Sequence, residues 1–230
     1  MRSAKKLNKQ TVITLAILAS LITIALVFVG FFYAKYIKEL NFSGNVTISA
    51  DLCESFTLTE HKVTQRPDGS YVVESKTAVT ENEYYVLPGI DIPKDPTVEI
   101  TGKTAIDSYL FIEVVDRVDH EIISFSLDSH WQEVTDAVPK NGGKVYVFCV
   151  DGAPAVLNDK TDKDLISSIG IIKDDTLNVT EDSIDADGKT IMDFYSQTGV
   201  AVDLDFYGYL VQINEGESVA QVFNKLAPAG

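Results

Sequence analysis

Strand patterns follow one another almost without interruption from Asn45 to Ile213. In "NVTISADL", residues 45–52, apolar and polar side chains alternate, and "GVAVDLDFYGYLVQI", residues 199–213, alternates before both faces become apolar. A period of two residues places the two sets of side chains on opposite faces of a strand. Other segments rich in β-branched and aromatic residues lie at 55–63, 70–75, 109–116, 121–127 and 143–150. The pattern predicts an all-β fold.

Turn and helix signals complete this prediction. Pro67-Asp68-Gly69 separates two of the strand segments, and this combination is typical of a hairpin turn. Ser218 and Gln221 form a capping box before apolar residues at helical spacing, which predicts a short C-terminal helix. The segment 162–171 fits either a helix or a strand. No repeat or Pro-rich linker divides residues 45–226. We therefore expect one β-sandwich with jelly-roll-like connections over residues 45–230.

The N-terminus has a different composition. Residues 10–34 carry no charge, follow four basic residues, and precede Lys35. As a helix this run would reach ~37 Å, which exceeds the ~30 Å hydrocarbon core of a membrane. Residues 1–34 therefore form either a signal peptide, which a signal peptidase removes, or a retained membrane anchor. The basic side should stay in the cytoplasm, which places the rest of the chain outside the cell.

The charge distribution agrees with export. Six of the 19 basic residues and none of the 34 acidic residues precede Glu39, which leaves 13 basic residues and a formal charge of −21 for the remainder. So acidic a domain does not bind nucleic acid or an anionic membrane surface through bulk electrostatics. The excess of carboxylates favours solubility outside the cell, with cation binding as the alternative.

Two cysteines leave two interpretations open. Cys53 and Cys149 both lie in strand-like contexts, and an even number outside the cell permits a disulfide. A bridge closing so long a loop would stabilise the fold by up to ~4.7 kcal/mol in the chain-entropy model. The alternative is two separately buried thiols, because cysteine is among the most buried residue types.

One acidic segment has partial similarity to a calcium-binding loop. In "DSIDADGKT", residues 182–190, Asp185 and Asp187 occupy middle positions of a calcium loop. The first ligand would be Ser183, and Phe194 stands where a bidentate Glu is required, so the loop is not an EF-hand. An Asp-rich turn is the default, and an irregular Ca²⁺ site at these two residues is the alternative.

No catalytic constellation is visible, so we expect a protein that is not an enzyme. "HEII" at 120–123 opens like a zinc-protease motif, but Ser124 stands where the second His is required. The chain contains no G-x-S-x-G elbow, no phosphate-binding Gly-rich loop and no Cys-x-x-Cys pair. The single Trp131 is interpreted as a core or rim anchor.

The segment "LPGIDIPKDP", residues 87–96, is interpreted as a corner of the scaffold. Pro88-Gly89 is the signature of a type II turn. Pro93 and Pro96 lack backbone donors, so the segment cannot be a helix or the interior of a central strand. Lys94 and Asp95, between these prolines, are expected to pin the turn.

Several segments of the chain, taken together, resemble a known protein family. The chain resembles the SipW-dependent exported proteins, which include the TasA, camelysin and BsaA-like biofilm-matrix proteins of Gram-positive bacteria. The resemblance lies in the order and spacing of four features: "GNVTISADL", "LPGIDIPKDPTVEITGKTAIDSYLFIEVVD", a lone Trp and "LDFYGYLVQINEGESVAQVFNKL". The resemblance covers most of residues 10–226. The residues that fall on the family pattern are Pro88, Gly89, Ile92, Lys94, Asp95, Pro96, Val98 and Tyr109.

The resemblance implies a secreted or surface-held jelly-roll sandwich that polymerises into matrix fibres. It further implies that residues 35–44, as an extended linker or donor strand, pair with the next subunit, with Phe42, Val46 and Ile48 as apolar donor side chains. The partners would be further copies or related matrix subunits, and no cofactor is expected. The alternative is a membrane-anchored extracellular binding module that holds Ca²⁺ in the acidic loops at 158–164 and 182–188.

Overall fold

The computed structural model describes residues 37–40, 52–53, 55–82, 84, 89–102, 104, 106–118, 120, 123–161, 167–180 and 204–226. The apolar run at 10–34, the donor residues Phe42, Val46 and Ile48, and the acidic pair Asp185 and Asp187 lie outside these ranges. Within them, no helix combines the length and the apolar character needed to span a membrane.

The larger sheet contains the strand patterns with two apolar faces. All its pairings are antiparallel. Its strands run in the order β1 (Ile37–Leu40), β13 (Leu204–Gln212), β6 (Ser108–Asp116), β9 (Lys144–Val150) and β10 (Ala153–Pro154), with β8 (Trp131–Glu133) also on β9. β6 and β13 pair over nine residues, from Leu204↔Asp116 to Gln212↔Ser108, and form the centre of this sheet.

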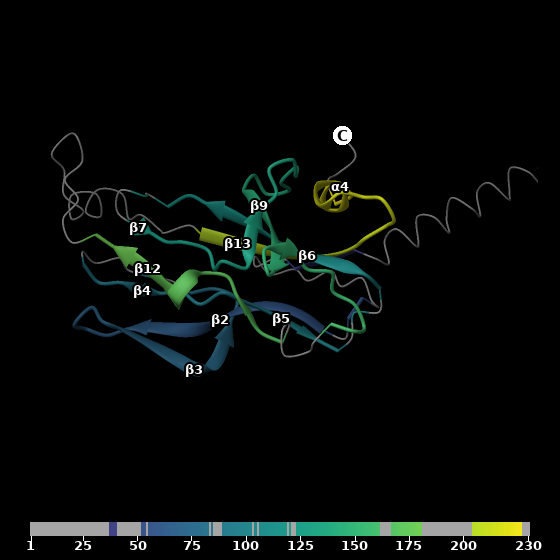
Figure 1. The fold of residues 1–230 in the computed structure, drawn as a ribbon. Helices are drawn as coiled ribbons and strands as arrows, with labels where there is room; N and C mark the ends of the chain where they lie inside the picture. Colours follow the sequence, from purple (N-terminus) through teal and green to yellow (C-terminus); the bar gives the residue numbers. More distant parts are fainter. Residues whose placement is uncertain are drawn as a thin grey trace, which may run out of the picture.

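Two smaller antiparallel sheets lie opposite the larger one (Figure 1). One has the order β11 (Ile169–Gly170), β5 (Thr97–Thr101), β2 (Ser55–Gln65) and β3 (Tyr71–Val79). The other has the order β4 (Ile92–Pro93), β12 (Thr176–Val179) and β7 (Ile123–Ser124). A 3₁₀ turn, η1 (Lys173–Asp175), precedes β12. The predicted β2–β3 hairpin is confirmed, with Gly69 at a φ of 87°.

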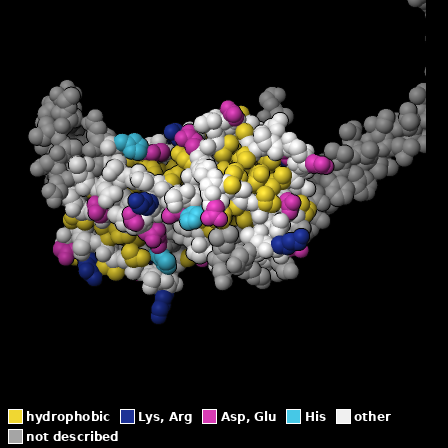
Figure 2. All heavy atoms as spheres, viewed as in Figure 1, with side chains coloured by type: hydrophobic (Ala, Val, Ile, Leu, Met, Phe, Trp, Pro, Cys, Tyr) yellow, Lys and Arg dark blue, Asp and Glu magenta, His cyan; other side chains and the backbone are white. Residues whose placement is uncertain are grey.

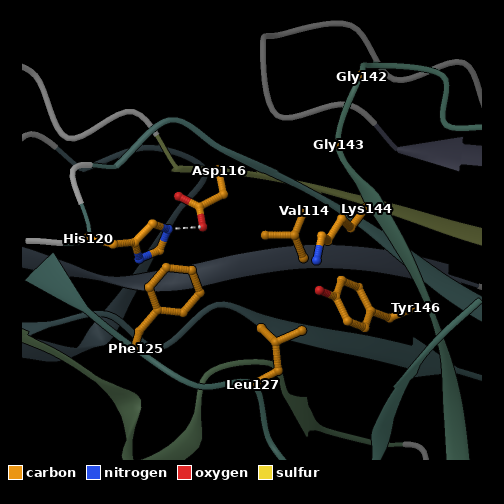
Figure 3. A pocket seen from close by; sticks show the side chains of 9 residues that line it. All are labelled: Val114, Asp116, His120, Phe125, Leu127, Gly142, Gly143, Lys144 and Tyr146. Carbon is orange, nitrogen blue, oxygen red and sulfur yellow. Dashed lines mark hydrogen bonds and ion pairs between the residues drawn. The ribbon is translucent and has the colours of Figure 1, made fainter. Parts of the chain in front are cut away.

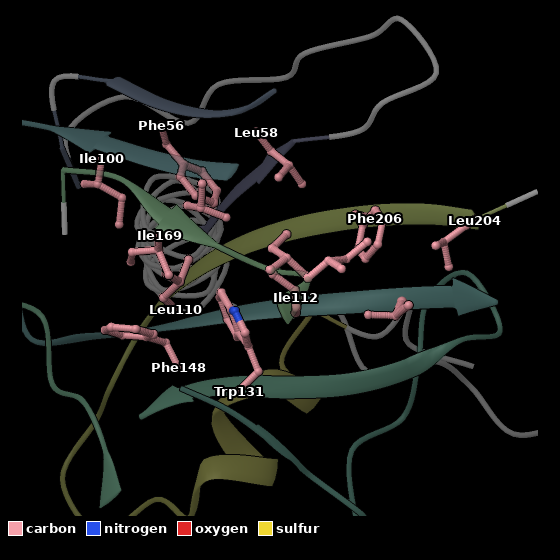
Figure 4. Packing of buried hydrophobic residues seen from close by; sticks show 14 of the residues in the cluster. Phe56, Leu58, Ile100, Leu110, Ile112, Trp131, Phe148, Ile169, Leu204 and Phe206 are labelled. Carbon is pink, nitrogen blue, oxygen red and sulfur yellow. The ribbon is translucent and has the colours of Figure 1, made fainter. Parts of the chain in front are cut away.

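The two faces of the larger sheet bury different clusters. The inner face packs Leu110, Ile112 and Phe206 against Phe56 and Leu58 of β2 (Figure 4). The outer face buries a second cluster under the C-terminal helix α4 (Val219–Asn224): Phe111, Val145, Val147, Cys149, Tyr209, Val211, Val222, Phe223 and Leu226. Coverage on both sides explains why β6 and the second half of β13 are apolar on both faces. The expected all-β sandwich is confirmed.

Helix α4 begins as predicted from the sequence. The Ser218 hydroxyl accepts a hydrogen bond from the Gln221 backbone N–H at 3.3 Å, and the Gln221 side chain accepts one from the Ser218 N–H at 2.8 Å. This capping box satisfies two of the amide donors that a helix N-terminus leaves without a partner. Val222 and Phe223 then face the sheet and are buried.

The bridge between Cys53 and Cys149 is not formed. Cys53 precedes β2, outside any strand, and belongs to the inner cluster, whereas Cys149 lies on β9 in the outer cluster. The side chains of the two cysteines therefore lie in different layers of the molecule. The sequence allowed either a disulfide or two separately buried thiols, and the structure contains the separate thiols. Burial raises the pKa of the Cys149 thiol, which lowers its reactivity.

Gly143 lies where the chain enters β9 and passes close to β6. A Cβ at this position would lie 2.2 Å from the Val114 carbonyl oxygen, which is backbone and cannot swing away. We expect Gly143→Ala to lower the free energy of unfolding by ~1–3 kcal/mol, as overpacking does. Gly170→Ala is the control, because its Cβ would meet nothing closer than 3.9 Å. Equal urea midpoints for the two variants would contradict the close approach.

Candidate functional site

The segment 89–97 forms a corner that joins the two smaller sheets. Gly89 has a φ of 68°, as the third residue of a type II turn requires, and its N–H donates to the Thr180 carbonyl at 3.2 Å. Pro93 lies in β4 opposite Thr176, and β4 is an edge strand, where a missing donor is tolerated. We refer to residues 92–97 as the KDP corner.

Lys94 connects the KDP corner to β2 through a buried ion pair. Its Nζ lies 2.8 Å from Oε2 and 3.0 Å from Oε1 of Glu60, and the two side chains are only 12% and 4% exposed. The Tyr84 hydroxyl donates to the same carboxylate at 3.5 Å, and Lys94 Nζ lies 5.4 Å from the centre of the Tyr84 ring. Burial and the Glu60 charge raise the pKa of Tyr84, so its hydroxyl stays a donor.

Asp95 binds the next residue of β2. Its Oδ1 accepts the His61 backbone N–H at 2.9 Å, and its Oδ2 pairs with His61 Nδ1. The Thr97 hydroxyl donates to the Asp95 carbonyl at 2.9 Å and closes the turn. The Lys94 N–H donates to the Asp175 carbonyl at 2.8 Å, which adds η1 to the network.

These contacts make the KDP corner a connection between elements that are distant in sequence. No partner for Lys94 or Asp95 could be identified from the sequence, and the structure provides Glu60 and His61 on β2. One signal was present: Phe56, Leu58 and Glu60 follow at two-residue spacing, which places a carboxylate on the apolar face of β2. A buried carboxylate requires a cation or several donors nearby.

The His61–Asp95 pair predicts a pH dependence of stability. The hydrogen bond that the protonated His61 ring donates to Asp95 holds the pKa of His61 above its ordinary value of 6.5, although partial burial opposes this. A raised folded-state pKa stabilises the protein below the unfolded-state pKa, and this contribution is lost as the pH rises through the folded-state pKa. We therefore expect the thermal midpoint to fall as the pH rises above 6.5, the ordinary pKa of histidine. His61→Gln should flatten this part of the profile, and an unchanged slope would contradict the assignment.

The edge of the larger sheet is formed by β1, which begins shortly after the apolar N-terminal run. β1 pairs antiparallel with β13 in the register Ile37↔Val211 to Leu40↔Gly208. The other side of β13 pairs with β6, so β1 supplies the hydrogen-bonding partner of the outer edge of β13. The donor segment predicted from the sequence, residues 35–44, contains this strand.

Gly208 lets the two layers approach at this edge. It lies opposite Leu40 on one side and Ile112 on the other. A Cβ at Gly208 would meet Cζ of Phe56 at 3.0 Å, so glycine leaves room for that ring. The β13 edge is therefore backed by the inner core, and its backbone is held in place while β1 pairs with it.

Two aromatic residues singled out in the sequence have structural contacts. Tyr109 is half-buried on β6, and its ring lies edge-on to the ring of Phe111, with 6.1 Å between the two ring centroids. Trp131 is buried, and its indole N–H donates to the Gly170 carbonyl at 2.9 Å, which ties β8 to β11. Trp131 is therefore a core anchor, as interpreted from the sequence.

In the described ranges, no group of three or more His, Cys, Asp or Glu side chains could hold a metal ion. Asp185 and Asp187 lie outside those ranges. His120 pairs with Asp116 at 2.9 Å, and Ile123–Ser124 form strand β7, whereas a zinc-protease motif requires a helix there. Acidic side chains are spread over several parts of the face in Figure 2.

Comparison with protein-family models, with curated proteins and with solved structures finds no match for this chain. The resemblance to the biofilm-matrix proteins therefore rests on the motif residues and their order alone. Of these, Gly89, Lys94, Asp95, Pro96 and Tyr109 lie in the described part of the chain, and Pro88 does not. The KDP corner joins three chain segments, β4, β2 and η1, at one place.

Proposed function

We propose that this chain is an exported structural protein, a subunit or accessory of surface or biofilm-matrix fibres that self-associates through β-strand donation. The observation that carries the proposal is the pairing of β1 with the edge of β13. β1 is short, adjacent to the N-terminal run, and joined to the sheet only at its edge. Such a strand can pair with the same edge of another copy without any change in the rest of the sandwich.

The energetics of replacing a chain's own β1 by the β1 of a second copy support this scheme. A β1 strand from a second copy restores the same backbone hydrogen bonds along Gly208–Val211 that the chain's own β1 makes. The enthalpy of the two arrangements is therefore similar, and concentration decides between them. An edge left open when β1 detaches is also a template for a further strand, so each added copy presents a new acceptor.

The packing of the rest of the sandwich is consistent with a structural role. The core fills both faces of the larger sheet, and the buried Lys94–Glu60 pair fixes the KDP corner on β2. The nine-residue antiparallel pairing of β6 with β13 adds a long run of backbone hydrogen bonds to this scaffold. A scaffold of this kind transmits load through its sheet and needs no catalytic group.

Export follows from the N-terminal sequence. The uncharged run at 10–34 after four basic residues directs the chain across a membrane, and a signal peptidase would release residues 35–230. The strongly acidic remainder stays soluble outside the cell. The resemblance adds a Gram-positive surface as the location.

Proline substitutions in β1 test the assembly mechanism. Neighbouring residues of an antiparallel strand direct their N–H groups to opposite sides, so one of Lys38→Pro and Glu39→Pro must remove a donor to β13. We expect that variant to abolish fibres seen by electron microscopy of the exported protein. Lys38→Ala and Glu39→Ala keep both donors and are the matched controls. Undiminished fibres from both proline variants would contradict strand donation.

A membrane-anchored extracellular binding module remains the alternative function. It predicts an intact N-terminal helix in the exported product, which N-terminal sequencing detects, and a chain that stays monomeric. Calcium binding in the acidic loops predicts a thermal shift on adding Ca²⁺ that disappears in Asp185→Ala and Asp187→Ala. Absence of any shift removes calcium from the account.

A further inference from the structure

A pocket of about 500 Å³ opens where β6 ends and β9 begins. Val114 and Asp116 of β6 and Lys144 and Tyr146 of β9 line one side, and Phe125 lies across from them, on the segment that follows β7 (Figure 3). Small-molecule sites commonly enclose about 300–1,000 Å³. The pocket therefore has the volume of a site for one or two small rings.

The inner wall of this pocket is apolar and partly aromatic. Val114 belongs to the inner core cluster, and Phe125, Leu127 and Tyr146 are half-buried side chains packed against that cluster. Gly142 and Gly143 line another part of the wall and add no side chain there. A ligand entering the pocket therefore meets carbon surface fixed by the core, which keeps the site formed without a ligand.

The rim carries an oriented carboxylate. Asp116 Oδ1 accepts the Val118 N–H at 3.0 Å, and Oδ2 pairs with His120 Nε2 at 2.9 Å. The His120 ring stacks on Phe125, with 6.0 Å between centroids and 30° between planes. These contacts hold Asp116 in one orientation while each of its oxygens keeps a second lone pair for another donor.

The rim also carries two hydrogen-bond donors, the ammonium of Lys144 and the hydroxyl of Tyr146. Lys144 lines the pocket and is 67% exposed, and its Nζ lies 3.5 Å from Glu133, which is not part of the lining. The Tyr146 hydroxyl faces the pocket (Figure 3). Burial, together with the negative charges of Glu133 and Asp116, raises the pKa of Tyr146, so this hydroxyl is protonated at neutral pH. Donors and an acceptor thus surround one apolar wall.

We propose that this pocket binds a neutral sugar ring. An anionic ligand would approach Asp116 and a cationic ligand would approach Lys144, so the mixed rim disfavours an excess of either charge. Sugar hydroxyls both donate and accept, which matches a carboxylate, an ammonium and a phenol within one site. The C–H face of a pyranose is apolar and suits the rings of Phe125 and Tyr146. The inference stands on the pocket and does not depend on fibre assembly.

Saturation-transfer NMR on the full-length chain, kept in a detergent without a sugar headgroup, tests this inference. The probes are methyl β-glucoside, methyl β-galactoside and N-acetylglucosamine, with benzoate and benzylamine as charged aromatic comparators. We expect saturable binding of at least one sugar, with the largest transfer to its ring C–H protons. Absence of saturable binding for all three sugars, or tighter binding of a charged comparator than of every sugar, would overturn the proposal.

Variants locate the binding. Phe125→Ala should weaken the affinity for the bound sugar at least about tenfold, since it removes an aromatic wall. Tyr146→Phe keeps the ring and the packing but removes the donor, so it should weaken affinity severalfold even if Phe125→Ala fails to fold. Tyr71→Phe, on β3 and away from the pocket, is the control. Unchanged affinity in Tyr146→Phe and in a folded Phe125→Ala would place the sugar elsewhere and overturn the assignment.

Discussion

Glu113→Ala is expected to lower the free energy of unfolding by at least about 3 kcal/mol, because it leaves several buried donors without an acceptor. Glu113 is fully buried on β6. Its carboxylate accepts the backbone N–H groups of Lys140, Asn141 and Gly143 at 3.0, 2.6 and 3.0 Å. The Asn141 side-chain amide and the Tyr209 hydroxyl, each at 3.1 Å, complete the set. One side chain therefore fixes the loop before β9 onto the centre of the sheet.

Urea unfolding followed by circular dichroism measures this loss. Glu113→Gln should fall between wild type and Glu113→Ala, because the amide keeps one acceptor but presents a donor to N–H groups. Glu99→Ala is the control, since Glu99 is an exposed carboxylate on β5 and its removal should change stability by less than about 0.5 kcal/mol. A loss in Glu113→Ala no larger than in Glu99→Ala would show that the loop is held by other contacts.

Lys94→Ala is expected to cost about 3–5 kcal/mol, because it leaves the Glu60 carboxylate buried without its cation. Glu60 is 5% exposed, and Tyr84 contributes only a long hydrogen bond at 3.5 Å. The chain could respond by opening the KDP corner to water, which would loosen β4 from β2. Hydrogen exchange should then show faster exchange around residues 92–97 than in β6.

A double-mutant cycle separates the energy of the Lys94–Glu60 interaction from the cost of burying each charge alone. Replacing both partners, as in Glu60→Leu with Lys94→Met, should be close to neutral, since a buried ion pair is often no more stable than an apolar pair of similar size. Lys62→Ala breaks an exposed pair with Glu74 at 3.7 Å, so it should cost less than about 1 kcal/mol. If Lys94→Ala costs no more than Lys62→Ala, Glu60 is solvated and the corner is not a buried connection.

Local patterns predicted the elements that depend on local physics. The alternation of Leu204, Asp205 and Phe206 predicted β13, because burial on one face requires a period of two. Ser218 and Gln221 predicted the start of α4, because a capping box is complete within four residues. The turn at Pro67-Asp68-Gly69 predicted the β2–β3 hairpin for the same reason.

Contacts between distant segments were not predictable in this way. Lys94 and Glu60 are 34 residues apart. The loop donors to Glu113 are 27–30 residues away from it, and Tyr209 is 96 residues away. In both cases a carboxylate at an apolar strand position signals that partners exist but does not identify them. The pairings of β4 and β7 with β12 are only two residues long, too short for a periodicity to form. The choice between a Cys53–Cys149 bridge and two separate thiols stayed open in the sequence, because sequence separation carries no information about which layer each thiol occupies.

In the proposed fibre, the N-terminal strand of one copy pairs with the β13 edge of the next. Electron microscopy of the exported protein, with and without residues 35–44, tests it most directly. We expect unbranched fibres from the chain that retains these residues and only monomers from the chain that lacks them. Monomers from both proteins under all conditions, or equal fibres from both, would contradict it.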